Sequence, residues 1–338
     1  MNENNWIHRQ GEKKNKGILI LILIILVAGV TITLSTSQTE MTVYVSTDGS
    51  GDFNCDGTDD HIEINEALAY VAENPEFTTV HLKGPNTYLI SDSIFVGSNT
   101  ILEGDPTAVI KLKDKADWPL EKPPLITQRD SSESQNITVK GFEIDGNHDG
   151  NREKSRGGKG YHNLVHFLNC KNIRVYDMYM HDSHGDGLKV VKGSDIQFYN
   201  NTVYKVGHDA LYIIYSSDIG GAWNNKITCR TNSGLRVYNG NHVKFYNNII
   251  NSEGEGGAGI EIQKTGSSTV MDDIEIYNNL LYETNAAGIW ITGYGPAYSK
   301  DSAKDVYIHN NRFYKTGINP GAAWAGGAWS STDFIIPL

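Results

Sequence analysis

Short segments in which apolar and polar residues alternate recur along most of the chain. Five of them align on a paired asparagine: DIQFYNNTVY (195–204), GAWNNKIT (221–228), HVKFYNNIIN (242–251), DIEIYNNLLY (273–282) and DVYIHNNRFY (305–314). NIRVYDMYM (172–180) is an earlier copy, with Asp177 at the first asparagine position. Alternation with a period of two over such lengths predicts short β-strands.

Each copy continues, after a few turn residues, into a further strand of alternating pattern. These strands are LVHF (164–167), GLKV (187–190), ALYI (210–213), GLRV (234–237), GIEI (259–262) and GIWI (288–291). Counted from Asp177, the first-asparagine positions lie 23, 24, 23, 31 and 32 residues apart. Three strands in each such repeat make one coil of a solenoid, whose stacked coils bury their apolar residues together. The repeat predicts an all-β fold, a right-handed single-stranded parallel β-helix over residues 42–338.

Asparagine suits the bend of such a coil. It tolerates the left-handed backbone conformation, and its side-chain amide can bond to the amide of the next coil.

Residues 60–73 break the strand pattern and repeat with helical spacing instead. Their apolar residues fall on one helical face: Ile64, Ala67, Leu68 and Val71. Thr58 or Asp59 can cap the start of this helix, and Asn74-Pro75 ends it. We expect an N-terminal capping α-helix over the open first coil. Early coils then run through VHL (80–82), IFV (94–96), TIL (100–102) and VIKL (109–112).

Residues 17–34 are apolar and uncharged, and they follow a basic segment, residues 1–16. This pattern predicts a transmembrane anchor, with a cleaved signal peptide as the alternative. Residues 35–41 would be a linker. Either interpretation places the rest of the chain outside the membrane, on the cell surface or secreted.

Charge and cysteine content narrow the function. The formal net charge is −11, with +2 on residues 1–16 and −13 on the remainder. An acidic body disfavours nucleic acid as a partner but permits an extracellular polysaccharide. Cys55, Cys170 and Cys229 lie far apart and form no CxxC motif, so we expect no zinc site and at most one disulfide. Solenoids often associate side by side, which leaves a homo-oligomer open.

The block DGTDDHIEINEAL (56–68), followed by strands and paired-asparagine coils, resembles the pectin-lyase-like superfamily of β-helix proteins. This resemblance covers residues 42–319. The chain is also similar to the disaggregatases of methanogens, surface enzymes that break the matrix glycan holding cells together. Both resemblances imply an extracellular protein that acts on carbohydrate.

The alternating strands predict columns of outward side chains, one residue from each coil. One column is His166, Lys189, Tyr212, Arg236, Glu261 and Trp290. The positions just before these strands give Asn163, Asp186, Asp209 and Ser233, and one step earlier lie His162, Gly185, His208 and Asn232. A wet surface that mixes aromatic, basic and acidic groups suits a sugar polymer. We predict as substrate-binding residues His162, His166, His184, Lys189, Tyr212, Arg230, Arg236, Glu261 and Trp290.

Four of these segments are similar to the signature segments of polygalacturonase-type glycosidases, which read N-T-D-G, D-D-C, G-H-G and R-I-K. They are SHGDGLKV (183–190), GHDALYI (207–213), NSGLRV (232–237) and AGIEIQ (258–263). The resemblance implies that Asp186 and Asp209 activate water and that His208 stands where the family has its acid. We therefore predict Asp186, Asp209 and His208 as catalytic residues of a polysaccharide hydrolase. Inversion needs an acid and a base about 6.5–9.5 Å apart, which carboxylates on adjacent coils could supply.

The same segments depart from that family at three positions. Ser233 replaces its histidine, and Glu261 and Gln263 replace its arginine and lysine. This argues against pectin and favours an amino-sugar or mixed glycan as the substrate.

Two other functions stay open. A polysaccharide lyase would use Lys189 or Arg236 as the base, with Arg230 or calcium neutralising a uronate carboxylate. A surface adhesin or structural rod would need the coils but no acid–base cluster, and Asp-Gly pairs also occur simply because they turn well.

Residues 145–160 form a polar, glycine-rich insertion before the first groove position. We expect either a flap that carries Arg152, Lys154 and Arg156 to an anionic substrate or an ordinary surface loop.

The sequence also matches the pattern of a calcium-binding loop. We expect hydrolysis itself to require no cofactor. The ligand positions of the loop are Asp52, Asn54, Asp56, Asp60 and Glu63. The alternative is that these acidic residues cap the N-terminus of the helix that follows.

Overall fold

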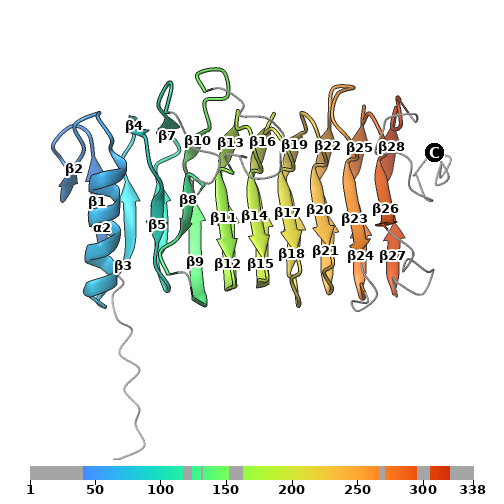
Figure 1. Cartoon of the computed structure of the whole chain (residues 1–338), viewed down its shortest axis with the longest axis horizontal. Helices are drawn as coiled ribbons and strands as arrows, with labels where there is room; N and C mark the ends of the chain where they lie inside the picture. The colour runs from blue at the N-terminus through green and yellow to red at the C-terminus, as the bar shows by residue number, and fades with distance from the viewer. Residues whose placement is uncertain are drawn as a thin grey trace, which may run out of the picture. The chain divides into compact units, whose positions relative to one another are not determined.

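Three parallel β-sheets, wound in successive coils along one axis, form the described body of the protein (Figure 1). The computed structural model describes residues 41–116, 124–130, 132–151, 163–265, 271–294 and 305–319. From β3 to β26, each coil contributes one strand to each sheet, and strands that pair within a sheet come from consecutive coils. The predicted right-handed parallel β-helix is confirmed.

The strands are grouped by sheet. Sheet A contains β1 (Met41–Ser46), β2 (Phe53–Asn54), β3 (Phe77–Leu82), β6 (Ile101–Gly104), β9 (Ser134–Lys140), β12 (Cys170–Tyr176), β15 (Ser194–Tyr199), β18 (Gly221–Trp223), β21 (Val243–Tyr246), β24 (Ile274–Tyr277) and β27 (Val306–His309). Sheet B contains β4 (Asn86–Ile90), β7 (Ala108–Leu112), β10 (Glu143–Asp145), β13 (Tyr179–His181), β16 (Thr202–Tyr204), β19 (Lys226–Thr228), β22 (Ile249–Asn251), β25 (Leu280–Tyr282) and β28 (Arg312–Tyr314). Sheet C contains β5 (Ile94–Val96), β8 (Ile126–Gln128), β11 (Val165–Leu168), β14 (Leu188–Val191), β17 (Leu211–Ile214), β20 (Leu235–Tyr238), β23 (Ile260–Thr265) and β26 (Ile289–Tyr294).

Helix α2 (His61–Glu73) lies at the N-terminal end of the coil stack, as predicted (Figure 1). It buries Ile64, Ala67, Leu68 and Val71 in the core. Its N-cap is Asp60, so the expectation of Thr58 or Asp59 is wrong by one or two residues. The Asp60 side chain makes no cap bond, because its carboxylate accepts the backbone N–H of Gly57 at 2.8 Å and of Leu89 at 2.7 Å.

The two asparagines of each pair have different structural roles. The first of each pair adopts the left-handed conformation, with φ between 55° and 57° at Asn200, Asn224, Asn247, Asn278 and Asn310. The second is buried, and these amides bond from coil to coil: Asn201 to Asn225 at 3.1 Å, then Asn225 to Asn248, Asn248 to Asn279 and Asn279 to Asn311, each at 2.9 Å. Such ladders satisfy buried polar groups and fix the register of neighbouring coils.

Aromatic rings stack along the outer side of sheet A. The stack runs through Tyr176, Tyr199, Trp223, Tyr246, Tyr277 and His309, with successive centroids 4.6–5.6 Å apart and ring planes within 8° of parallel. Because each inner ring faces another ring on both sides, the stack turns its edges outward.

The three cysteines are free thiols, each buried in the core, so the one disulfide that the sequence allowed does not form. Within the residues that the structure describes, no helix is long and apolar enough to cross a membrane. The segment at 17–34 lies outside those residues.

Candidate active site

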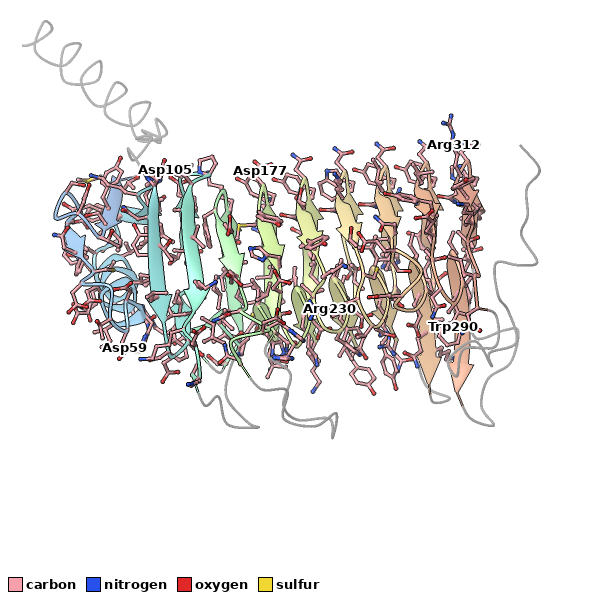
Figure 2. The ribbon with its side chains drawn as sticks, turned by 90° about the horizontal axis from the view of Figure 1, so that it is seen from above. Asp59, Asp105, Asp177, Arg230, Trp290 and Arg312 are labelled. Atoms are coloured by element: carbon pink, nitrogen blue, oxygen red, sulfur yellow. The ribbon has the colours of Figure 1, made fainter. Side chains whose placement is uncertain are left out.

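The predicted outward column on sheet C exists in the expected register. His166 pairs with Lys189, Lys189 with Tyr212, Tyr212 with Arg236, Arg236 with Glu261 and Glu261 with Trp290. Residues spread over more than a hundred positions of sequence thus become neighbours, one coil apart. Figure 2 shows Asp177 and Arg312 at one long edge of the coil stack, whereas Arg230 lies on the other side.

Asp186 and Asp209 belong to the turns that lead from sheet B into sheet C. In these turns, a side-chain oxygen of each coil accepts the backbone N–H of the next coil: Asn163 from Asp186 at 2.8 Å, Asp186 from Asp209 at 3.0 Å, and Asp209 from Ser233 at 2.8 Å. Both aspartates are almost fully buried. Both side chains therefore have a structural role in these turns, in addition to any chemical one.

His208 joins the two carboxylates. Its Nδ1 lies 2.7 Å from Asp186 Oδ1 and 3.1 Å from Asp209 Oδ2. The backbone of Gly207, just before His208, packs closely on the backbone of His184, because a Cβ at Gly207 would lie only 2.5 Å from it. The structure therefore brings together the three residues that the sequence predicts as catalytic.

The electrostatics of this cluster favour a charged histidine. Burial opposes the imidazolium, but Asp209 and Asp186 outweigh it and raise the pKa of His208 from 6.5 to about 9. Burial also opposes the Asp186 carboxylate, yet His208 lowers its pKa below the ordinary value. Burial raises the pKa of Asp209, against the effect of His208 and Arg236. At neutral pH the site holds a protonated imidazole beside an ionised aspartate.

The two aspartates lie closer than the separation expected of an acid and a base in inversion. Atoms of Asp186, His208 and Asp209 all lie within 4.8 Å of one another. That is short of the 6.5–9.5 Å of such pairs, so the expected spacing is wrong for these two residues. The reason is His208, which draws both carboxylates onto one nitrogen.

Arg236 extends the cluster by one coil. Its guanidinium lies 3.4 Å from Asp209 Oδ2 and 3.3 Å from Glu261 Oε2, and its Nε donates to Gln263 Oε1 at 3.1 Å. Burial opposes the charge, but Asp209 and Glu261 hold the pKa of Arg236 above its usual range. Ser233 also donates to Glu261 Oε2, at 2.9 Å.

Three predicted substrate contacts differ from the expectation of open, solvent-facing groups. Glu261 and Trp290 are only 1% and 3% exposed, and Trp290 packs with Ala258 and Ala287. The ring of Tyr212 lies 5.3 Å from Lys189 Nζ and 4.5 Å from the Arg236 guanidinium carbon. These cations come from the coils on either side of Tyr212, so they compete with a sugar for its faces.

His166 lies at the opposite end of the column. Burial, followed by the charge of Lys189, lowers its pKa to about 4, so this imidazole is neutral at physiological pH. Its buried Nε2 has no hydrogen-bond partner among the residues described.

Two other predicted substrate contacts, His184 and Arg230, form bonds outside the cluster. His184 is buried and donates from Nε2 to the carbonyl oxygens of Asn151, at 2.8 Å, and His148, at 3.0 Å. It anchors the start of the 145–160 insertion. Arg230 pairs with Asp182 at 3.3 Å, toward sheet B.

His162 and the predicted flap residues Arg152, Lys154 and Arg156 lie outside the described residues.

The predicted calcium ligands are largely engaged in local turns. Asp52 accepts the N–H of Tyr44, Asn54 bonds with Gly51, and Asp56 accepts the N–H of Thr58. Only Asp60 and Glu63 share a group of ligand atoms within 4.8 Å, and their third member is Cys55. Calcium binding stays a prediction.

Asn232 and Gln263 also contact the cluster, although neither is among the predicted catalytic or substrate-binding residues. Asn232 Nδ2 donates to Asp209 Oδ1 at 2.8 Å and lies 3.4 Å from His208 Nε2. Both stand in the predicted columns or beside them, so coil register was the signal that could have identified them.

The fold defines a class, the right-handed parallel β-helix proteins. A family model described as "Disaggregatase related" matches residues 271–335. The family 28 exopolygalacturonase of Yersinia enterocolitica is similar in structure, with a TM-score of 0.63, 16% identity, and coverage of 81% of this chain and 59% of that one. The exopolygalacturonase of Thermotoga maritima has a TM-score of 0.56 and 12% identity, over 74% of this chain and 71% of that one. No curated protein sequence matches.

These comparisons establish the fold, and the chain spans 59% of the length of the Yersinia enzyme.

Proposed function

We propose that this protein hydrolyses glycosidic bonds of an extracellular polysaccharide at the cluster of Asp186, Asp209 and His208. The observation that carries the proposal is the buried contact of one imidazole with two carboxylates at 2.7 and 3.1 Å. A solvated surface ladder does not need this arrangement, whereas a general acid gains from it the raised pKa that keeps it protonated. The N-terminal apolar segment supports export to the cell surface as part of the same proposal.

The residues divide the work between them. Asp186, whose pKa is lowered, is the base that takes a proton from the attacking water, through Oδ2, because its Oδ1 binds His208 and the N–H of Asp209. This base and its acid, His208, are closer than the pair of an inverting enzyme, so the proposal is hydrolysis and does not include inversion. His208 is the acid that protonates the leaving oxygen. Its Nδ1 is committed to the carboxylates, so Nε2, beside Asn232, is the atom that would hand on the proton. Asp209 holds the imidazole of His208 in place, and Arg236 in turn binds Asp209.

The substrate follows from the charges around Arg236. Glu261 and Gln263 both bind its guanidinium, which is therefore already engaged and poorly placed to hold a sugar carboxylate. We infer cleavage beside a sugar without a carboxylate, as in an amino-sugar or mixed glycan.

A lyase needs an unprotonated base, and Arg236 is unsuited to that role because its pKa is raised. The decisive experiment incubates the protein with amino-sugar and uronate glycans and measures new reducing ends together with ultraviolet absorbance. Hydrolysis yields reducing ends alone, whereas β-elimination also yields an absorbing double bond. Absence of both products with every glycan would point to an adhesin and refute the proposal.

The pKa of His208 predicts the alkaline limit of activity. If the protonated imidazole is the acid, kcat/KM should stay level at neutral pH and fall as the pH rises through about 9. On the acidic side, kcat/KM should fall only at a pH below the ordinary pKa of aspartate, because the pKa of Asp186 is lowered. A rate profile across this range tests both limbs. A His208→Gln variant should lose the alkaline limb, and a parent profile that stays level well above pH 9 would remove His208 from this role.

A further inference from the structure

A hollow of about 400 Å³ opens on the outer side of sheet B. Its wall residues include Tyr179, Tyr204 and Tyr282, and its floor includes Thr228 and Asn251. A volume of this order is typical of sites for small ligands.

Strand register explains how the hollow arises. Tyr204, Thr228, Asn251 and Tyr282 occupy the same outward position in four consecutive coils, on β16, β19, β22 and β25. Two small residues between two tyrosines leave a gap, and three strand spacings set those tyrosine positions about 14 Å apart. Tyr204 is 36% exposed, whereas Thr228 and Asn251 are 8% and 5% exposed.

The floor is polar and well ordered. The Asn251 amide donates to the Thr228 hydroxyl at 3.2 Å and to the Tyr282 hydroxyl at 3.1 Å. The second bond draws Tyr282 toward Asn251 and fixes its side chain at one end of the hollow. Hydroxyl and amide groups at the base of an aromatic pocket match the hydroxyls and the C–H faces of a pyranose ring.

The charges at the rim are paired within the protein. Lys205 pairs with Glu253 at 2.7 Å and lies 5.5 Å from the Tyr204 ring centroid, and Lys315 pairs with Glu283 at 3.5 Å. Lys226 adds one cation. Since Lys205 and Lys315 are each paired with a glutamate, their charges are not free to bind an anion. The lining residues therefore do not form the cluster of cations that an anionic sugar would require.

Two other sets of aromatic groups offer less to a sugar. The rings on sheet A cover one another's faces, and Tyr212 on sheet C lies between two cations. We propose that the sheet B hollow is a second carbohydrate-binding site that takes a neutral pyranose of a polysaccharide. It would hold the polymer on the protein while the cluster at the sheet C turn acts elsewhere along the chain. The inference stands whether or not the protein is an enzyme.

Affinity electrophoresis tests this site. The purified protein is run through gels containing galactomannan or a soluble β-glucan as neutral probes and polygalacturonate as the anionic probe. We expect retardation by a neutral probe, with about tenfold weaker affinity in Tyr204→Ala and Tyr282→Ala. Tyr204→Phe keeps the ring and should keep most of the affinity. The matched control is Tyr314→Ala, because Tyr314 follows Tyr282 in the same column and is 56% exposed but does not line the hollow.

Three results would overturn the proposal: no retardation by either neutral probe, retardation by polygalacturonate alone, or equal loss in Tyr314→Ala and Tyr204→Ala. Failure of the catalytic proposal is a separate outcome. An Asp186→Asn variant should keep its retardation by the neutral probe even if it loses all turnover.

Discussion

An Asp186→Asn variant should fold like the parent protein and lose turnover by a factor of about 10²–10⁴. The substitution separates the two tasks of this residue. Asp186 Oδ1 accepts the backbone N–H of Asp209 at 3.0 Å and the imidazole of His208 at 2.7 Å. An asparagine oxygen can accept both bonds, so the coil register is preserved. The amide cannot take a proton from water, and the negative charge that raises the pKa of His208 is lost.

The measurement is the rate of reducing-end release, with circular dichroism and the denaturation midpoint as checks on folding. Asp209→Asn is a less clean variant, because Asp209 Oδ2 faces both His208 and Arg236 and an amide N–H there would oppose two donors. Asn163→Ala serves as the structural control, since it removes the same kind of bond one coil earlier, where Asn163 accepts the N–H of Asp186. If Asp186→Asn retains full turnover, the aspartates are turn residues only and the active site lies elsewhere.

The period of the repeat was enough to predict which side chains become neighbours. A two-residue alternation fixes the face of each residue, and a spacing of 23 or 24 fixes its coil. For this reason the column from His166 to Trp290 and the approach of Asp186, His208 and Asp209 follow from sequence alone. The helix at 61–73 follows from its own apolar spacing in the same way.

The period of the repeat did not predict how deeply each side chain is buried or which groups it contacts. Glu261 and Trp290 occupy outward positions yet are buried, and alternation carries no information about what covers an outward residue. The two cations beside Tyr212 depend on how long side chains lean along the stack. The hollow on sheet B arises from two small residues, Thr228 and Asn251, and a gap in a column is harder to notice than a motif.

The largest stability effect is expected at the second asparagine of the pairs, where Asn225→Ala should lower the free energy of unfolding by about 2–5 kcal/mol. Asn225 Oδ1 accepts the backbone N–H of Asn201 at 3.0 Å, and its Nδ2 donates to the carbonyl of Phe198 at 2.9 Å. Alanine leaves both of these buried groups without a partner and interrupts the amide ladder between Asn201 and Asn248. Chemical denaturation monitored by circular dichroism measures the loss.

The residue before Asn225 supplies a matched control. Asn224 is the same residue type one position earlier, but it is exposed and has φ of 57°, a conformation that glycine adopts freely. Asn224→Gly should therefore change stability by less than about 1 kcal/mol. If both variants lose the same amount, the bend itself and not the buried ladder holds the coils in register. Because Arg236 and Ser233 reach the site from the same coil, loss of register in Asn225→Ala should also weaken turnover well below the unfolding transition. Turnover unaffected by that variant would mean that the cluster is positioned by its own turn bonds alone.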